Sequence, residues 1–155
     1  AYEILIGLVG WEMCIRDRRC RYTNKEVELL ARLMRSEALG EGVYGMKLVG
    51  NVVINRVVAK CTTFKNINTI YDAIFQKGQF EGTKTPLFNG RPNKAEKQRA
   101  MDCIKYWRGD PAYKALFFQN PGKNKPCKQK WWGVFEGRYK NHCFYNPETK
   151  WKCGL

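Results

Sequence analysis

The chain has 155 residues, of which 44% are hydrophobic, and carries a formal net charge of +14 at pH 7. One hydrophobic core is normal at this length, and the absence of internal repeats, linkers and low-complexity stretches excludes a repeat array or a multidomain chain. The basic excess suits an anionic polymer, nucleic acid included, although it also fits a surface that only aids solubility.

Residues 12–18, Glu-Met-Cys-Ile-Arg-Asp-Arg, resemble a translated transposase adaptor of the kind used to prepare sequencing libraries. We therefore interpret residues 1–19 as adaptor-derived or unrelated sequence and residues 20–155 as one domain; a genuine basic connector is the alternative. The apolar run 4–9 is too short to span a bilayer and lacks the basic start and cleavage site of a signal peptide. The native N-terminus and any signal stay unknown.

The next segment predicts a helix that carries a glutamate at the edge of its apolar face. Thr23 and Glu26 form a capping box. Apolar side chains then follow at the spacing of one helical face, at Val27, Leu30, Ala31, Met34 and Ala38. Glu37 lies beside this stripe, where partial desolvation would raise its pKa toward the range of a general acid. The alternative is a solvated helix-edge Glu37, with Glu41 in an ordinary loop.

Further helices are predicted as far as residue 107. The valine-rich segment 48–59 keeps a helical stripe and predicts a buried helix packed on the Glu37 helix. Residues 69–76 predict a short helix, and Asn93 with Glu96 predicts a capped helix through residue 107. The segment 80–92, with its glycines and prolines, predicts a long surface loop and a candidate wall of a cleft.

The C-terminal third changes to short aromatic-rich runs separated by proline and glycine. Residues 115–119, 131–135 and 143–145 predict short strands or extended segments. The sequence therefore predicts an α+β domain that is mainly helical with a few short strands.

Six cysteines follow the adaptor-like segment: Cys20, Cys61, Cys103, Cys127, Cys143 and Cys153. Six cysteines permit about fifteen fully paired connectivities, so the pairing stays open, and buried free thiols are an equal alternative. His142 is the only histidine and no Cys-x-x-Cys motif occurs. This argues against a zinc ribbon and a zinc amidase, and we expect neither a metal nor a cofactor.

Four motifs in order resemble the spore cortex-lytic and related cell wall hydrolase family. They are SEALGEGVYGMKLVGNVVINRV at 36–57, Gly-Gln-Phe at 78–80, Asp-Pro at 110–111 followed by Phe-Gln-Asn-Pro at 118–121, and Asn-His-Cys-Phe-Tyr at 141–145. The resemblance covers residues 27–145. It implies a lysozyme-like α+β domain that cleaves the glycan strand of peptidoglycan, with Glu37 as the catalytic acid.

The resemblance also implies a sugar cleft. Gln79 and Asn120 would bond N-acetyl or hydroxyl groups, and Phe80 would stack on a sugar ring. Trp131 and Trp132 are further stacking candidates, although aromatic residues in strand-like runs are more often core. His142 would either orient a catalytic carboxylate or cap a loop.

Asn55 and Arg56 lie at the end of the predicted valine-rich helix, and we interpret them as structural residues. Arg56 would satisfy the terminal carbonyls of that helix or pair with a carboxylate.

Within this family we predict a lytic transglycosylase. Glu37 would protonate the bridging oxygen and then, as a carboxylate, take a proton from the C6 hydroxyl of the same sugar, leaving 1,6-anhydromuramic ends. A hydrolytic muramidase would need a second carboxylate, for which Glu41 is the nearest candidate in sequence. A noncatalytic basic protein that binds cell wall or nucleic acid is the third alternative.

The expected partner is peptidoglycan, with spore cortex as one candidate substrate, and neither nucleic acid nor a membrane span is expected. We expect a monomer located outside the cytoplasm, in the wall or spore cortex, or associated with a phage.

Overall fold

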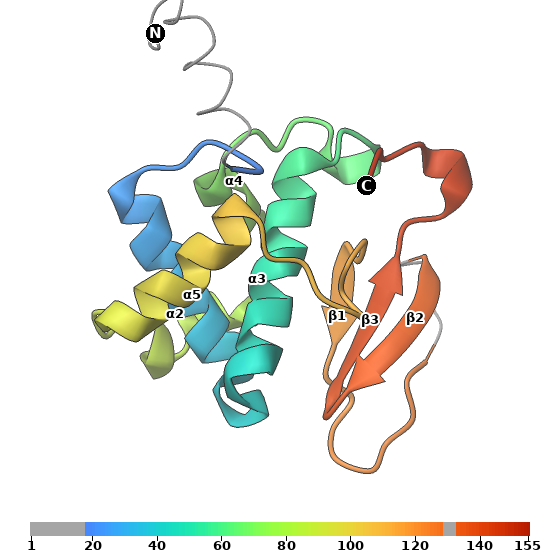
Figure 1. Ribbon diagram of the computed structural model, residues 1–155. Helices are drawn as coiled ribbons and strands as arrows, with labels where there is room; N and C mark the ends of the chain where they lie inside the picture. Colours follow the sequence, from blue (N-terminus) through green and yellow to red (C-terminus); the bar gives the residue numbers. More distant parts are fainter. Residues whose placement is uncertain (1–17, 129–132) are drawn as a thin grey trace, which may run out of the picture.

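The structure is a computed structural model that describes residues 18–128 and 133–155; Trp131 and Trp132 lie outside these ranges. The helices are α2 (Asn24–Ala38), α3 (Gly42–Val58), α4 (Ile70–Ile74) and α5 (Lys94–Lys105), and the strands are β1 (Phe117–Gln119), β2 (Val134–Tyr139) and β3 (His142–Asn146). Five short 3-10 helices connect them: η1 (Leu39–Glu41), η2 (Thr62–Phe64), η3 (Glu81–Lys84), η4 (Pro86–Phe88) and η5 (Thr149–Trp151). Figure 1 shows α3 between the other helices and the sheet.

Helix α2 begins with the predicted capping box. The Thr23 hydroxyl accepts the Glu26 amide at 3.1 Å, and the Glu26 carboxylate accepts the Thr23 amide at 2.9 Å. The second oxygen of Glu26 also accepts the amide of Tyr71 at 2.9 Å. The same side chain therefore starts α2 and holds the first turn of α4 against it.

Helix α3 is the central element of the domain. Its middle is buried on every side, with fully buried apolar side chains at Leu48, Val49, Val52, Val53 and Ile54. It packs on α2 and α5 and also contacts β1 (Figure 1). The predicted helix over 48–59 is confirmed, but it starts earlier, because Gly42 at φ +81° turns the chain directly from η1 into α3.

The remaining helices form near their predicted positions. The Thr69 side chain caps α4, and Asn93 with Glu96 forms a capping box for α5. The predicted loop 80–92 contains η3 and η4 rather than open chain. Arg35 on α2 fixes this segment, since its guanidinium donates to the carbonyls of Leu87 and Gly90.

The three strands form an antiparallel sheet in the order β1-β3-β2. The central strand β3 is buried at four successive residues, which explains its lack of alternation: His142, Cys143, Phe144 and Tyr145. A bulge interrupts the pairing of β2 with β3 between Phe135 and Gly137. The predicted α+β class, mainly helical with a few short strands, is confirmed.

Two disulfides form among the six cysteines, Cys61–Cys153 and Cys127–Cys143. Cys20 and the buried Cys103 remain thiols. Across residues 18–128 and 133–155, no helix combines the length and apolar character needed to cross a membrane.

Arg19 lies against the folded domain, although the predicted boundary placed it outside. Its guanidinium donates to the amide oxygens of Asn51 at 2.9 Å and Asn55 at 2.6 Å, both fully buried on α3. Its backbone amide donates to the carbonyl of Ile104 at the end of α5. The boundary between residues 19 and 20 stays a prediction, and these contacts argue for including Arg19 with the domain.

Candidate active site

A cleft of about 870 Å³ opens where α2, α3 and the sheet meet. Five of the predicted site residues line it: Glu37, Gln79, Phe80, Asn120 and His142. Its other described lining residues are Arg56, Thr62, Thr63, Gly78, Glu81, Lys84, Phe117, Phe118, Gln119 and Trp151. This volume is within the usual range of ligand-binding clefts.

Glu37 lies at the C-terminal end of α2, half-buried on the cleft wall. Burial raises the pKa of its carboxyl, and the negative charge of Glu81 acts in the same direction. A hydrogen bond from the Gly82 amide to Oε2 (N···O 2.7 Å) and the charges of His142 and Arg56 oppose that rise in pKa. Desolvation is the largest of these effects, so the acid form of Glu37 is favoured relative to a free glutamate.

Gly82 is placed so close to Glu37 that a side chain here would displace the Glu37 carboxyl. A Cβ atom at this position would lie 2.5 Å from Glu37 Oε2 and 2.5 Å from Ser36 Oγ. The missing side chain lets the backbone amide of η3 reach the carboxyl directly. One backbone hydrogen bond therefore fixes the orientation of the candidate acid.

Glu41 lies behind His142 and is 6% exposed. Its Oε1 accepts the amide of Asn141 at 2.8 Å and lies 3.0 Å from His142 Nδ1. Since a carboxylate accepts this bond, we assign the proton to Nδ1, which leaves Nε2 as the ring nitrogen without that contact. The predicted orienting role of His142 thus has a partner, but that partner is Glu41.

Arg56 is a buried cation in the floor of the cleft, 2% exposed. It donates to the Leu116 carbonyl at 2.8 Å and to Gln79 Oε1 at 3.0 Å. Its guanidinium carbon lies 4.5 Å from the ring centre of Phe80. Burial lowers its pKa to about 9. Its partners are therefore Leu116 and Gln79, not the predicted carbonyls of its own helix end.

These contacts define how the motif residues face the cleft. Phe80 is only 6% exposed and stacks on Phe118 with ring centres 5.8 Å apart, so it serves as floor more than as a free platform. The Gln79 oxygen is occupied by Arg56, and its NH₂ group is the part that can donate to a substrate oxygen. Asn120 is exposed and accepts the Gly122 amide at 2.9 Å.

Among the lining residues that sequence reasoning missed, Glu81 and Trp151 are the most informative. Glu81 directly follows the Gly-Gln-Phe motif and could have been found from that position. Trp151 reaches the cleft because Cys153 is bonded to Cys61, next to Thr62 and Thr63 on the rim. Disulfide pairing cannot be read from the sequence alone, so this position carried no usable signal.

A model of the cell wall hydrolase family matches residues 40–145, and the chain belongs to this family. The matched segment contains Glu41, Gln79, Phe80, Asn120 and His142 but begins after Glu37.

Relatives agree with this membership. The chain is 43% identical over 131 residues to the cell wall hydrolase CwlJ of Halalkalibacterium halodurans, covering 83% of this chain and 90% of that protein. It is 41% identical over 131 residues to CwlJ of Bacillus subtilis, covering 84% and 91%. The crystal structure of the catalytic domain of Bacillus cereus SleB superposes with a TM-score of 0.64 at 26% identity, covering 81% of this chain and 93% of that domain.

Proposed function

We propose that this cell wall hydrolase is a lytic transglycosylase that cleaves the glycan strand of peptidoglycan, with Glu37 as both acid and base. The observation that supports it is a carboxyl whose pKa is raised by burial, at the wall of a cleft lined with amide and aromatic side chains. A raised pKa keeps more of the carboxyl protonated near neutral pH, as a general acid requires.

In the first step the neutral Glu37 carboxyl donates its proton to the oxygen between N-acetylmuramic acid and N-acetylglucosamine. The bond from that oxygen to the anomeric carbon breaks, its electron pair stays with the departing sugar, and an oxocarbenium-like muramic residue remains. The Gly82 amide and the Arg56 charge stabilise the carboxylate that forms.

In the second step the Glu37 carboxylate takes the proton of the muramic C6 hydroxyl. The hydroxyl oxygen bonds to the anomeric carbon, which closes the 1,6-anhydro ring and restores the acid. No water is consumed. Because the attacking hydroxyl belongs to the same sugar, its effective concentration is high and no second carboxylate is needed to activate it.

Similar proteins support this choice over a muramidase. The solved catalytic domain of SleB from Bacillus anthracis is described as a germination-specific lytic transglycosylase, and it superposes with a TM-score of 0.64 at 24% identity. A Bacillus cereus protein named spore cortex-lytic enzyme is 30% identical over 100 residues, which are 64% of this chain and 36% of that protein. We therefore propose peptidoglycan outside the cytoplasm, spore cortex included, as the substrate.

A muramidase remains the rival mechanism, and its second carboxylate would be Glu81. Glu81 is exposed and lines the cleft, whereas Glu41 is buried against His142. Glu81→Gln should leave a transglycosylase active but should strongly impair a two-carboxylate enzyme.

Product analysis tests the proposal. Purified cortex or sacculi are digested in heavy-oxygen water and the muramic ends are weighed by mass spectrometry. Anhydro ends without label are expected, and Glu37→Gln should lower their release by about 100-fold or more while folding and polymer binding persist. Labelled reducing ends would establish a muramidase. If Glu37→Gln released fragments as fast as wild type, Glu37 would have no part in the mechanism.

A further inference from the structure

A second hollow lies on the sheet side of the molecule and is strongly basic. Its volume is about 590 Å³, and the described residues that line it are Lys123, Asn124, Lys125, Pro126, Arg138, Lys140 and Asn141. Four of these carry a positive charge and none is acidic. Across the described ranges, none of the three lysines forms an ion pair with a carboxylate. We call this hollow the basic pocket.

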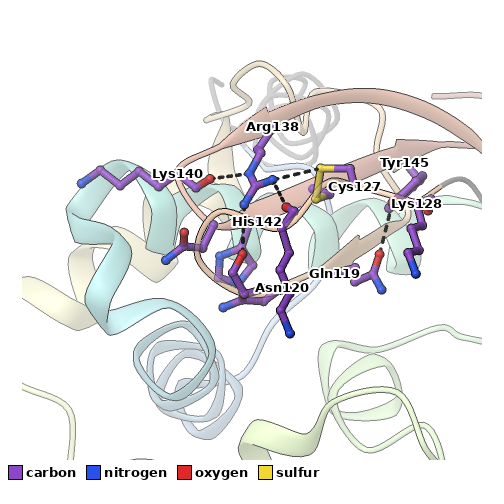
Figure 2. Close-up of a disulfide and its surroundings, with 12 residues drawn as sticks. Gln119, Asn120, Cys127, Lys128, Arg138, Lys140, His142 and Tyr145 are labelled. Atoms are coloured by element: carbon purple, nitrogen blue, oxygen red, sulfur yellow. Dashed lines mark hydrogen bonds between the residues drawn. A yellow bond between two sulfur atoms is a disulfide. The ribbon is translucent and has the colours of Figure 1, made fainter.

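The basic pocket is held in shape by Arg138. Its guanidinium donates to the carbonyls of Lys140 (2.7 Å), Gly122 (3.2 Å) and Lys125, and lies beside the sulfur of Cys127 (Figure 2). Carbonyl oxygens satisfy the guanidinium without cancelling its charge. Arg138 therefore clamps the loop after β1 onto the turn between β2 and β3 and still adds to the positive field.

The Cys127–Cys143 disulfide is the second clamp. It bonds the same loop to the central strand β3. Since the loop is fixed at two points, Lys123 and Lys125 stand on a defined frame and line the basic pocket together with Lys140. The Lys140 side chain extends away from Arg138 (Figure 2), and its Nζ lies 5.6 Å from the ring centre of Tyr139.

The basic pocket adjoins the cleft. Asn141 lines the pocket and the next residue, His142, lines the cleft. One carboxylate, that of Glu41, holds both through the Asn141 amide and the His142 ring. On the other side, Asn120 lines the cleft and accepts the amide of Gly122, just before Lys123. The two hollows therefore meet at residues 120–123 and 141–142, on the side where a substituent on a sugar in the cleft would leave toward the basic pocket.

We propose that the basic pocket binds the carboxylates of the peptide stem carried by a muramic residue in the cleft. This inference rests on the proposed function, because it takes the glycan to lie along Glu37. The sugar rings offer no charge to such a pocket, and a strand without its stem keeps only the lactyl carboxylate close to the ring, whereas each stem carries further carboxylates at a distance from the ring. The pocket thus selects glycan strands that bear stems over bare strands.

The test compares strands of one length with and without stems, the latter made by amidase treatment, both free of teichoic acid. Wild-type protein should show a lower KM for strands with stems, and this preference should shrink as salt rises. The preference is the ratio of KM for bare strands to KM for strands with stems. In a Lys123→Gln, Lys125→Gln, Lys140→Gln variant this ratio should fall about tenfold, which is the sum expected for three exposed charge contacts.

The matched control removes the same three charges elsewhere. Lys94, Lys97 and Lys105 are exposed on α5 and line neither hollow, and their change to Gln should leave the preference for stems intact. An equal loss in both triple variants would overturn the proposal in favour of general charge attraction. In a parallel assay with teichoic acid added back, an effect of the pocket variant that appears only there would overturn the proposal in favour of a phosphate polymer.

Binding separates this inference from the proposed function. Strands with and without stems are titrated calorimetrically into Glu37→Gln protein, which does not need to turn over. A preference for stems that the pocket variant loses supports the basic pocket even if the products show another cleavage chemistry. Equal affinity for both strands in that protein overturns the basic pocket even if the anhydro product is found.

Discussion

Removing the Cys61–Cys153 disulfide should both destabilise the domain and loosen one rim of the cleft. The bond closes a segment of 92 residues, against 16 for Cys127–Cys143. In the chain-entropy model these lengths correspond to about 4.6 and about 3 kcal/mol at 25 °C, because the longer closure restricts the unfolded chain more. Against a usual total of about 5–15 kcal/mol, the larger loss is serious.

The effect on function follows from what the bond joins. Thr62 and Thr63 follow Cys61, Trp151 precedes Cys153, and all three side chains line the cleft. Glu37 and Gly82 lie on α2 and η3, whose mutual contact does not involve this disulfide. We therefore expect the double variant Cys61→Ala, Cys153→Ala to raise KM for glycan more than it lowers kcat.

Denaturant unfolding followed by circular dichroism measures the stability. Steady-state glycan turnover measures KM and kcat, which report on the loosened rim. The matched control is Cys127→Ala, Cys143→Ala, which should lose less stability. The reasoning is refuted if the Cys61 variant unfolds within about 1 kcal/mol of wild type, or if the two variants rank in the opposite order.

Three further predictions concern Glu37 and the start of the domain. Gly82→Ala should cut turnover about 10-fold or more, because its methyl group would push the Glu37 carboxyl aside. The control Gly40→Ala, whose methyl group meets nothing within 4 Å, should keep the wild-type rate. Equal rates of the two variants in steady-state assays would refute this prediction. Since folding raises the pKa of Glu37, its stabilising contribution is present below the ordinary glutamate pKa and is lost as pH rises through the folded value. Glu37→Gln should therefore have a higher melting temperature than wild type at about pH 8 and the same melting temperature at about pH 3. If the difference in melting temperature between variant and wild type were the same at both pH values, the direction of the pKa shift would be contradicted. A chain that begins at Arg18 should unfold like the full chain, whereas one that begins at Cys20 should lose about 2–4 kcal/mol in denaturant, because Asn51 and Asn55 lose their partner; equal stability would restore the predicted boundary.

The local signals of the sequence were sufficient for most of the helices. The capping boxes at Thr23 and Asn93 each lie within four residues, and both helices begin where those boxes predict. Such signals act inside a single turn, so tertiary contacts rarely override them. Helix α3 shows the limit, because Gly42 and Gly45 at its start have low helix propensity and hide its first turns.

Long-range contacts account for what the sequence could not supply. Glu41 meets His142 across 101 residues, and Trp151 reaches the cleft through a bond that spans 92. The resemblance in residues 36–57 and 78–80 drew attention to Glu37 and Gln79, but neither motif showed that Arg56 lies beneath them. A buried cation between aromatic rings has no sequence period of its own, so only the packed structure reveals it.

Glu37 and Glu41 belong to one short motif, yet the fold gives them different surroundings. Glu37 borders the cleft and receives a single backbone hydrogen bond, whereas Glu41 is enclosed and holds Asn141 and His142. A carboxylate engaged in this way cannot also position an attacking water in the cleft, so any two-carboxylate mechanism would have to use Glu81. A loss of activity in Glu41→Gln would therefore show that Glu41 places His142, and it would not identify a second catalytic carboxylate. For this reason the Glu81 variant, rather than the Glu41 variant, separates the two mechanisms.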